Sequence, residues 1–95
     1  MSAYIYANVE ITDPVAYQEY GRQVAAVVAA HGGRFLVRGG AVEVLEGAVT
    51  PHRQVILEFA DMAQLKAFYT SAEYSRLIPI RQRASIGHLL AIDGV

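Results

Sequence analysis

The chain contains no cysteine, which excludes a disulfide framework, a thiolate nucleophile and a cysteine-based zinc site. Charge is also scarce: eight basic and nine acidic side chains leave a net charge of −1. Without a basic field to hold a phosphate backbone, nucleic acid is not expected as a partner. No apolar run reaches the ~18 residues of a membrane span, and the N-terminus lacks the basic start of a secretory signal. We therefore expect a cytoplasmic protein that makes no membrane contact.

Apolar residues, in contrast, are plentiful. Hydrophobic residues make up 54% of the 95 positions and charged residues 18%, where about 25% charged is usual. Disorder requires the opposite composition. A chain of this length forms one domain, residues 1–95, and buries roughly 60–68% of its unfolded surface. The apolar excess is larger than one small core needs, so we expect part of it to face a partner.

Hydrophobic periodicity predicts two strand–helix–strand units. Residues 3–11 alternate between apolar and mixed positions, as in a strand with one buried face. Asp13 followed by Pro14 is typical of a helix start, and Gly32-Gly33 of a helix end. The predicted strands cover residues 3–11, 34–38 with a continuation over 42–46 after a break at Gly39-Gly40, 53–59 and 84–92. The predicted helices cover residues 14–31, 61–69 and 71–83.

The last two helices carry further signals. Asp61 with Gln64, and Thr70 with Glu73, have the spacing of capping boxes. Pro79 removes an internal hydrogen bond, which predicts a kink or a restart of the last helix. The element order is the split ferredoxin-like pattern βαββαβ. The sequence therefore predicts an α+β fold, with a four-stranded antiparallel sheet and helices packed on one face.

The other face of this sheet is too apolar to remain in water. The strand RQVILEF carries Val55 and Leu57 on one side and Ile56 on the other. The last strand repeats this pattern with Leu89 opposite Leu90. An exposed apolar sheet is an interaction surface, and a second copy of the same sheet is the simplest cover. We expect a homodimer formed through the open sheet face.

Five segments resemble a known family. The runs TDPVAYQEY, AAHGGRFLVRGG, VEVLEG, LEF and FYTSAEYSRLIPIRQRA follow one another along the chain. Together they resemble the domain-of-unknown-function 1330 family over essentially the whole chain. That family belongs to the dimeric α+β barrel superfamily, so the resemblance implies a ferredoxin-like protomer whose sheet packs on its twin to enclose a barrel. It implies no activity, because the family's name records that none is established. Other families of the superfamily include cofactor-independent monooxygenases, muconolactone isomerases and haem-dependent enzymes, and a shared fold does not fix a function.

Strand parity selects the candidate site residues. If the driest sides of the strands meet the helices, the barrel is lined by Tyr6, Asn8, Arg38, Glu58 and His88. In the functional interpretation Tyr6, Asn8 and Arg38 bind a carboxylate or enolate, and Glu58 or His88 moves a proton. In the structural alternative, Arg38 and Glu58 form an interface salt bridge and His88 is a hydrogen-bonded core residue.

Tyr69 and Arg81 lie in the segment that most resembles the family. They could close the mouth of the barrel and donate hydrogen bonds to a ligand, or serve only in helix packing. The three histidines are far apart in the sequence with no metal-binding spacing, so we expect neither a metal nor another cofactor. The leading hypothesis is a homodimer that binds a small anionic or enolisable molecule in the barrel, as a cofactor-independent isomerase or monooxygenase. The alternative is a non-catalytic dimeric binding or structural protein with a packed barrel.

Overall fold

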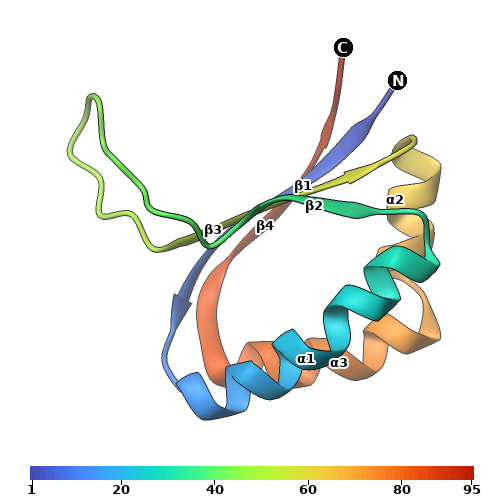
Figure 1. Cartoon of the computed structure of the whole chain (residues 1–95), viewed down its shortest axis with the longest axis horizontal. Coiled ribbons are helices and arrows are strands. Elements are labelled where there is room, and N and C mark those ends of the chain that lie inside the picture. Colours follow the sequence, from blue (N-terminus) through green and yellow to red (C-terminus); the bar gives the residue numbers. More distant parts are fainter.

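The computed structural model describes all 95 residues and places four strands in one antiparallel sheet with the helices on one face (Figure 1). The strand order is β2-β3-β1-β4, so both strand–helix–strand units contribute one central and one edge strand. This arrangement confirms the predicted ferredoxin-like α+β fold. None of the helices combines the length and apolarity that crossing a bilayer requires. The elements are β1 (Ala3–Ile11), α1 (Pro14–Ala30), β2 (Arg34–Arg38), β3 (Arg53–Phe59), α2 (Met62–Tyr69), α3 (Ala72–Ala84) and β4 (Ser85–Asp93).

Helix α1 begins and ends where its sequence predicts. The Asp13 side chain accepts a hydrogen bond from the Ala16 amide at 3.1 Å, and Pro14 occupies the first turn, where its missing N–H costs nothing. After the helix, Gly32 adopts a φ of +75°, a conformation that favours glycine. The chain can therefore turn directly into β2.

The structure confirms the predicted cap of α2 and corrects that of α3. The Asp61 carboxylate caps α2 by accepting from the Gln64 amide at 2.8 Å, as predicted. The second cap is Ser71 rather than Thr70, because the Ser71 hydroxyl accepts from the Tyr74 amide at 3.1 Å. Thr70 instead closes the end of α2. Helix α3 continues through Pro79 without a restart.

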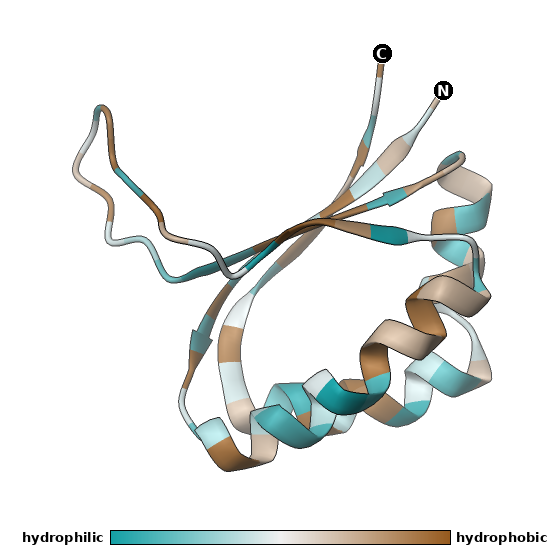
Figure 2. Cartoon of the chain, in the orientation of Figure 1, coloured by the Kyte–Doolittle hydropathy of each residue, from teal (hydrophilic) through white to brown (hydrophobic).

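The core lies between the sheet and the helices. Alternate residues of β1 point inward and are buried, as its sequence pattern predicts. Phe59, Phe68 and Tyr74 are each 1% exposed and stack on one another, with ring centroids 5.2 and 4.5 Å apart. Figure 2 shows hydrophobic residues in the middle of the sheet, where the strands overlap in this view. The buried cluster consists of Ala3, Ile5, Tyr20, Val24, Val28, Leu57, Phe59, Leu65, Phe68, Tyr74 and Leu77.

A bulge in β2 changes which side chains face the core. Phe35 lies opposite Leu57, but Val37 lies opposite Ile56 and Arg38 opposite Val55. Leu36 is thus an extra residue between two paired positions, and the residues after it change faces relative to a regular strand. Simple alternation along the sequence therefore assigns Val37 and Arg38 to the wrong sides.

Residues 39–52, which we call the arm, leave the sheet between β2 and β3 and extend away from the rest of the chain (Figure 1). The prediction that β2 resumes over residues 42–46 is wrong, since these residues form no strand. Strand formation needs a neighbour to satisfy the backbone groups, and no strand of the sheet pairs with the arm. Its apolar side chains remain exposed, namely Val42, Val44, Leu45 and Val49.

Candidate functional site

The open face of the sheet, which carries no helix, holds four of the predicted site residues: Tyr6, Asn8, Glu58 and His88. In the strand register Asn8 lies opposite His88, and Tyr4 lies opposite Glu58. These two positions are four residues apart on β1, or about 13 Å at the rise of a strand. The candidate proton carriers Glu58 and His88 are therefore not brought together.

Glu58 is held by an arginine that the sequence did not single out. Arg34 donates to its carboxylate at 2.7 Å, and the Tyr4 hydroxyl lies 3.4 Å away. The hydrogen bond from Arg34 lowers the pKa of Glu58 below its ordinary value. Glu58 is thus an ionised acceptor in a salt bridge, which makes it a poor proton donor at neutral pH.

Arg38 does not pair with Glu58, so the predicted convergence of these two side chains is wrong. The bulge at Leu36 turns Arg38 to the helix side of the sheet. There its guanidinium lies 4.2 Å from the centre of the Phe35 ring and donates to the Gly21 carbonyl oxygen of α1 at 3.2 Å. The strand therefore places Arg38 on the helix side of the sheet rather than on the open face, where the residue remains exposed.

Three further polar side chains of the open face bond to one another. The Tyr6 hydroxyl donates to the Gln54 side chain, and the Gln54 amide donates to the Asn8 side-chain oxygen at 2.8 Å. Tyr6 and Asn8 are therefore brought together as predicted, through a third residue. The network is also what an interface that must satisfy its buried polar groups would contain.

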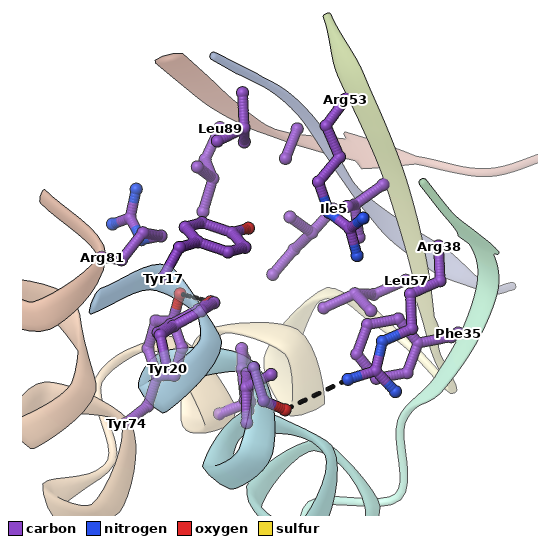
Figure 3. Close-up of a pocket in the computed structure, with 16 residues that line it drawn as sticks. Ile5, Tyr17, Tyr20, Phe35, Arg38, Arg53, Leu57, Tyr74, Arg81 and Leu89 are labelled. Carbon is purple, nitrogen blue, oxygen red and sulfur yellow. Dashed lines mark hydrogen bonds between the residues drawn. The ribbon is translucent and has the colours of Figure 1, made fainter. Parts of the chain in front are cut away.

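Tyr69 and Arg81, the two candidates from the segment that most resembles the family, lie in different places. Tyr69 is 38% exposed and lines a groove between α2 and β4. Arg81 points the other way, and only 9% of its surface is exposed. It faces a cavity between the sheet and helices α1 and α3, shown in Figure 3.

This cavity, which we call the inner cavity, has a volume of about 50 Å³ and combines apolar walls with a ring of hydrogen-bond donors. Such a volume exceeds the ~10–15 Å³ that a single water molecule needs. Figure 3 shows Arg81 reaching it from α3, whereas Arg38 and Arg53 approach it from the strands. No carboxylate or imidazole lines it. The polar lining consists of Arg38, Arg53 and Arg81 with the hydroxyls of Tyr17, Tyr20 and Tyr74.

The three arginines lack negative partners. None of them takes part in any of the ion pairs of the structure, which join other residues. The Nε atoms of Arg53 and Arg81 are buried without a hydrogen-bond acceptor. A buried cation without a partner is costly. Arg81 is buried as a whole and Arg53 is half-buried, whereas Arg38 is exposed. No negative group of the protein therefore balances the guanidinium groups beside the cavity, and a bound anion would do so.

A tyrosine pair borders the same space. The hydroxyls of Tyr20 and Tyr74 lie 2.8 Å apart. Burial raises the pKa of both, and the Arg81 guanidinium opposes part of the rise at Tyr74. Both phenols stay protonated at neutral pH, so they act as hydrogen-bond donors and acceptors rather than as bases.

Sequence reasoning missed Arg53, Tyr17 and Tyr20 as site residues. Tyr17 and Tyr20 have the spacing of a buried helix face, which indicates packing before binding. Arg53 did leave a signal, because it shares its parity with the inward-facing Val55 and Leu57 of β3. An arginine on the dry side of a strand is the pattern that would have identified it. Within the chain, no three histidine, aspartate or glutamate side chains gather into a metal site.

Comparisons with known structures agree with this fold. A protein of unknown function from Rhodopseudomonas palustris has a TM-score of 0.79 at 19% identity, covering 99% of this chain and 82% of that one. A dimeric ferredoxin-like protein of unknown function from Jannaschia sp. CCS1 has a TM-score of 0.68 at 13% identity, covering 99% and 100%. SnoaB, a cofactor-independent oxygenase from Streptomyces nogalater, has a TM-score of 0.67 at 9% identity, covering 99% and 93%. At such identities these likenesses establish the fold alone.

The sequence itself determines the family. No curated protein matches it significantly. A family model, described as a domain of unknown function (DUF1330), matches residues 2–95, which confirms the resemblance seen in the sequence. The chain belongs to the DUF1330 family.

Proposed function

We propose that the protein binds a small organic anion, such as a carboxylate, with its charged group in the inner cavity. The observation that carries this proposal is the pair of buried Nε atoms of Arg53 and Arg81, which face one cavity and have no acceptor. Guanidinium groups suit planar oxyanions, because their donors match the two oxygens of a carboxylate. A bound anion would supply the missing acceptors and offset the cost of the buried charge.

The walls of the cavity favour an organic anion over an inorganic one. Twelve of the sixteen lining residues are hydrophobic, and apolar walls with a few convergent polar groups are typical of small-molecule sites. The sequence placed the ligand in the barrel between two sheets. We place it instead within each protomer, because Tyr6, Gln54 and Asn8 on the open face already bond to one another, while the buried Nε atoms of Arg53 and Arg81 have no acceptor.

An activity on the bound anion is a narrower proposal. The lining donates hydrogen bonds and supplies no carboxylate or imidazole base, so the substrate would have to carry its own negative charge. Such donors stabilise an enolate or phenolate. This favours a cofactor-independent monooxygenase over an isomerase that must first remove a proton. The likeness to SnoaB, a cofactor-independent oxygenase, supports testing this chemistry by oxygen consumption.

We further propose that the protein is a homodimer joined through the open sheet face. Ile86, Leu90 and Ile92 are 67%, 53% and 47% exposed on this face, and an apolar surface of this kind favours association. The Jannaschia relative with the same fold is described as dimeric. Dimerisation would cover this face and leave the inner cavity of each protomer separate.

Thermal-shift measurements test the anion site. Benzoate should raise the melting temperature, whereas benzamide, which has a similar shape and no charge, should not. Replacing Arg81 with Met should abolish the response to benzoate. Without ligand, this replacement should stabilise the protein by about 1 kcal/mol, because it removes a buried charge that has no partner.

Arg83→Met is the matched control, since Arg83 lies on the same helix and is exposed. This variant should keep the response to benzoate. A full response in Arg81→Met, or an equal response to benzamide and benzoate, would contradict the proposal.

A further inference from the structure

A second hollow adjoins the inner cavity. It is an open cleft of about 450 Å³ between the first half of α1 and the ends of β1 and β3. Tyr17, Gly21 and Arg53 line both hollows, so they form the boundary between them. The outer part of this cleft is lined by Ile11, Pro14, Val15, Gln18 and Arg22.

Neither the backbone conformation nor the packing at this boundary requires residue 21 to be glycine. It lies in the middle of α1 with no positive φ, and a glycine there costs roughly 0.5–1 kcal/mol relative to alanine. Close packing does not require it either, since a Cβ added at Gly21 would have no heavy atom within 4 Å. What the missing side chain does provide is free space between the cleft and the inner cavity.

We infer that the ligand is longer than the inner cavity and passes Gly21 into the outer cleft. This inference rests on the proposed anion site. The carboxylate lies inside, against Arg81 and Arg53, and the rest of the molecule extends outward. There it contacts apolar side chains, of which Val15 is 80% exposed. The ligand class is therefore a carboxylate with an apolar tail, and Gly21 determines the length of tail that is accepted.

Arg53 has a place at the same boundary. Its guanidinium lies 5.9 Å from the centre of the Tyr17 ring and close to the backbone of Gly39. Gly39 itself has a φ of +70°, a conformation that favours glycine. Arg53 thus lies at the boundary that the carboxylate of an incoming ligand must pass.

The test compares anions of two lengths on the intact protein. Formate fits within the inner cavity, whereas 3-phenylpropionate must reach past Gly21. Titrations followed by amide chemical shifts should show that Gly21→Leu binds formate as the unchanged protein does. Its affinity for 3-phenylpropionate should fall about tenfold or more, the equivalent of losing about 1.4 kcal/mol.

Ala26→Leu, at an exposed position of the same helix, is the control and should change neither affinity. Leucine favours helix more than glycine does, so we expect Gly21→Leu to fold, and Gly21→Ala should give a smaller effect in the same direction. Unchanged 3-phenylpropionate binding in Gly21→Leu, with binding still dependent on Arg81, would overturn this inference alone. If the unchanged protein binds neither anion, the proposed function fails, and this inference fails with it.

Discussion

Four arginines of this protein, three in strands and one in a helix, have different partners. Arg34 and Arg38 both belong to β2, yet Arg34 pairs with a carboxylate on the open face and Arg38 reaches a backbone carbonyl on the inner side. Arg53 and Arg81 each retain a buried nitrogen without an acceptor. At the scale of single residues, an arginine that already has a partner serves the structure, whereas one with an unpaired buried nitrogen is available to bind a ligand.

The Arg34–Glu58 salt bridge should make stability depend on acid pH. Because the pKa of Glu58 is lowered in the folded protein, its stabilising contribution is present above the ordinary value of 4.5 and is lost as the pH falls through the folded value. Glu58→Gln should thus lower the free energy of unfolding at pH 7 and have little effect well below pH 4.5. Urea denaturation at both pH values, at fixed protein concentration, measures this.

Glu43 on the arm takes part in no ion pair, so Glu43→Gln serves as the control. If Glu58→Gln has the same effect at both pH values, the salt bridge does not supply the stabilisation.

At the scale of elements, local signals predicted most of the fold. The Asp13 and Asp61 caps and the alternation of β1 are determined by near neighbours in the sequence, and the structure confirms all three. The sequence did not indicate the bulge at Leu36, because a bulge depends on how β3 pairs with β2. Because of that single residue, the sequence pattern assigned Arg38 to the open face and did not indicate that it lines the inner cavity.

The bulge also makes the length of β2 adjustable. Removing Leu36 would leave Phe35 opposite Leu57 and Arg38 opposite Val55, as in a regular ladder. The deletion variant should therefore fold and keep its response to benzoate. Inserting one residue after Leu36 would instead move Arg38 toward the other face, and this variant should show a weaker response, because Arg38 lines the cavity.

Thermal-shift measurements on both variants make the comparison. Loss of the benzoate response in the deletion variant, while it remains folded by circular dichroism, would show that the bulge itself shapes the cavity.

At the scale of the whole molecule, the open face and the arm are the parts that one protomer leaves uncovered. The open face carries exposed apolar residues of β4, and the arm extends beyond the sheet (Figure 1). The sequence predicted the apolar face from its strand pattern. It did not predict the shape of the arm, because local strand propensity cannot show whether a neighbouring strand is available.

Replacing Ile56 with Asp should separate the proposed dimer. Ile56 lies on the open face in the central part of the sheet, opposite Tyr6, and an unpaired charge buried there is strongly unfavourable. Sedimentation equilibrium at micromolar concentration should give twice the chain mass of 10.3 kDa for the unchanged protein, and a single chain for Ile56→Asp.

Ala26→Asp, on the exposed side of α1, should remain dimeric. A mass of 10.3 kDa for the unchanged protein would rule out the dimer, and an unchanged mass for Ile56→Asp would place the interface elsewhere.

The tyrosines around the inner cavity make it visible to fluorescence without a label. The chain has six tyrosines and no tryptophan, so tyrosine supplies the intrinsic emission and no indole absorbs its energy. Three of the six, Tyr17, Tyr20 and Tyr74, border the inner cavity. A molecule that enters there displaces solvent beside half of the fluorophores, and an aromatic or enolate ligand that absorbs near 300 nm would quench them by energy transfer. Tyrosine fluorescence should therefore report directly on a ligand that occupies the inner cavity.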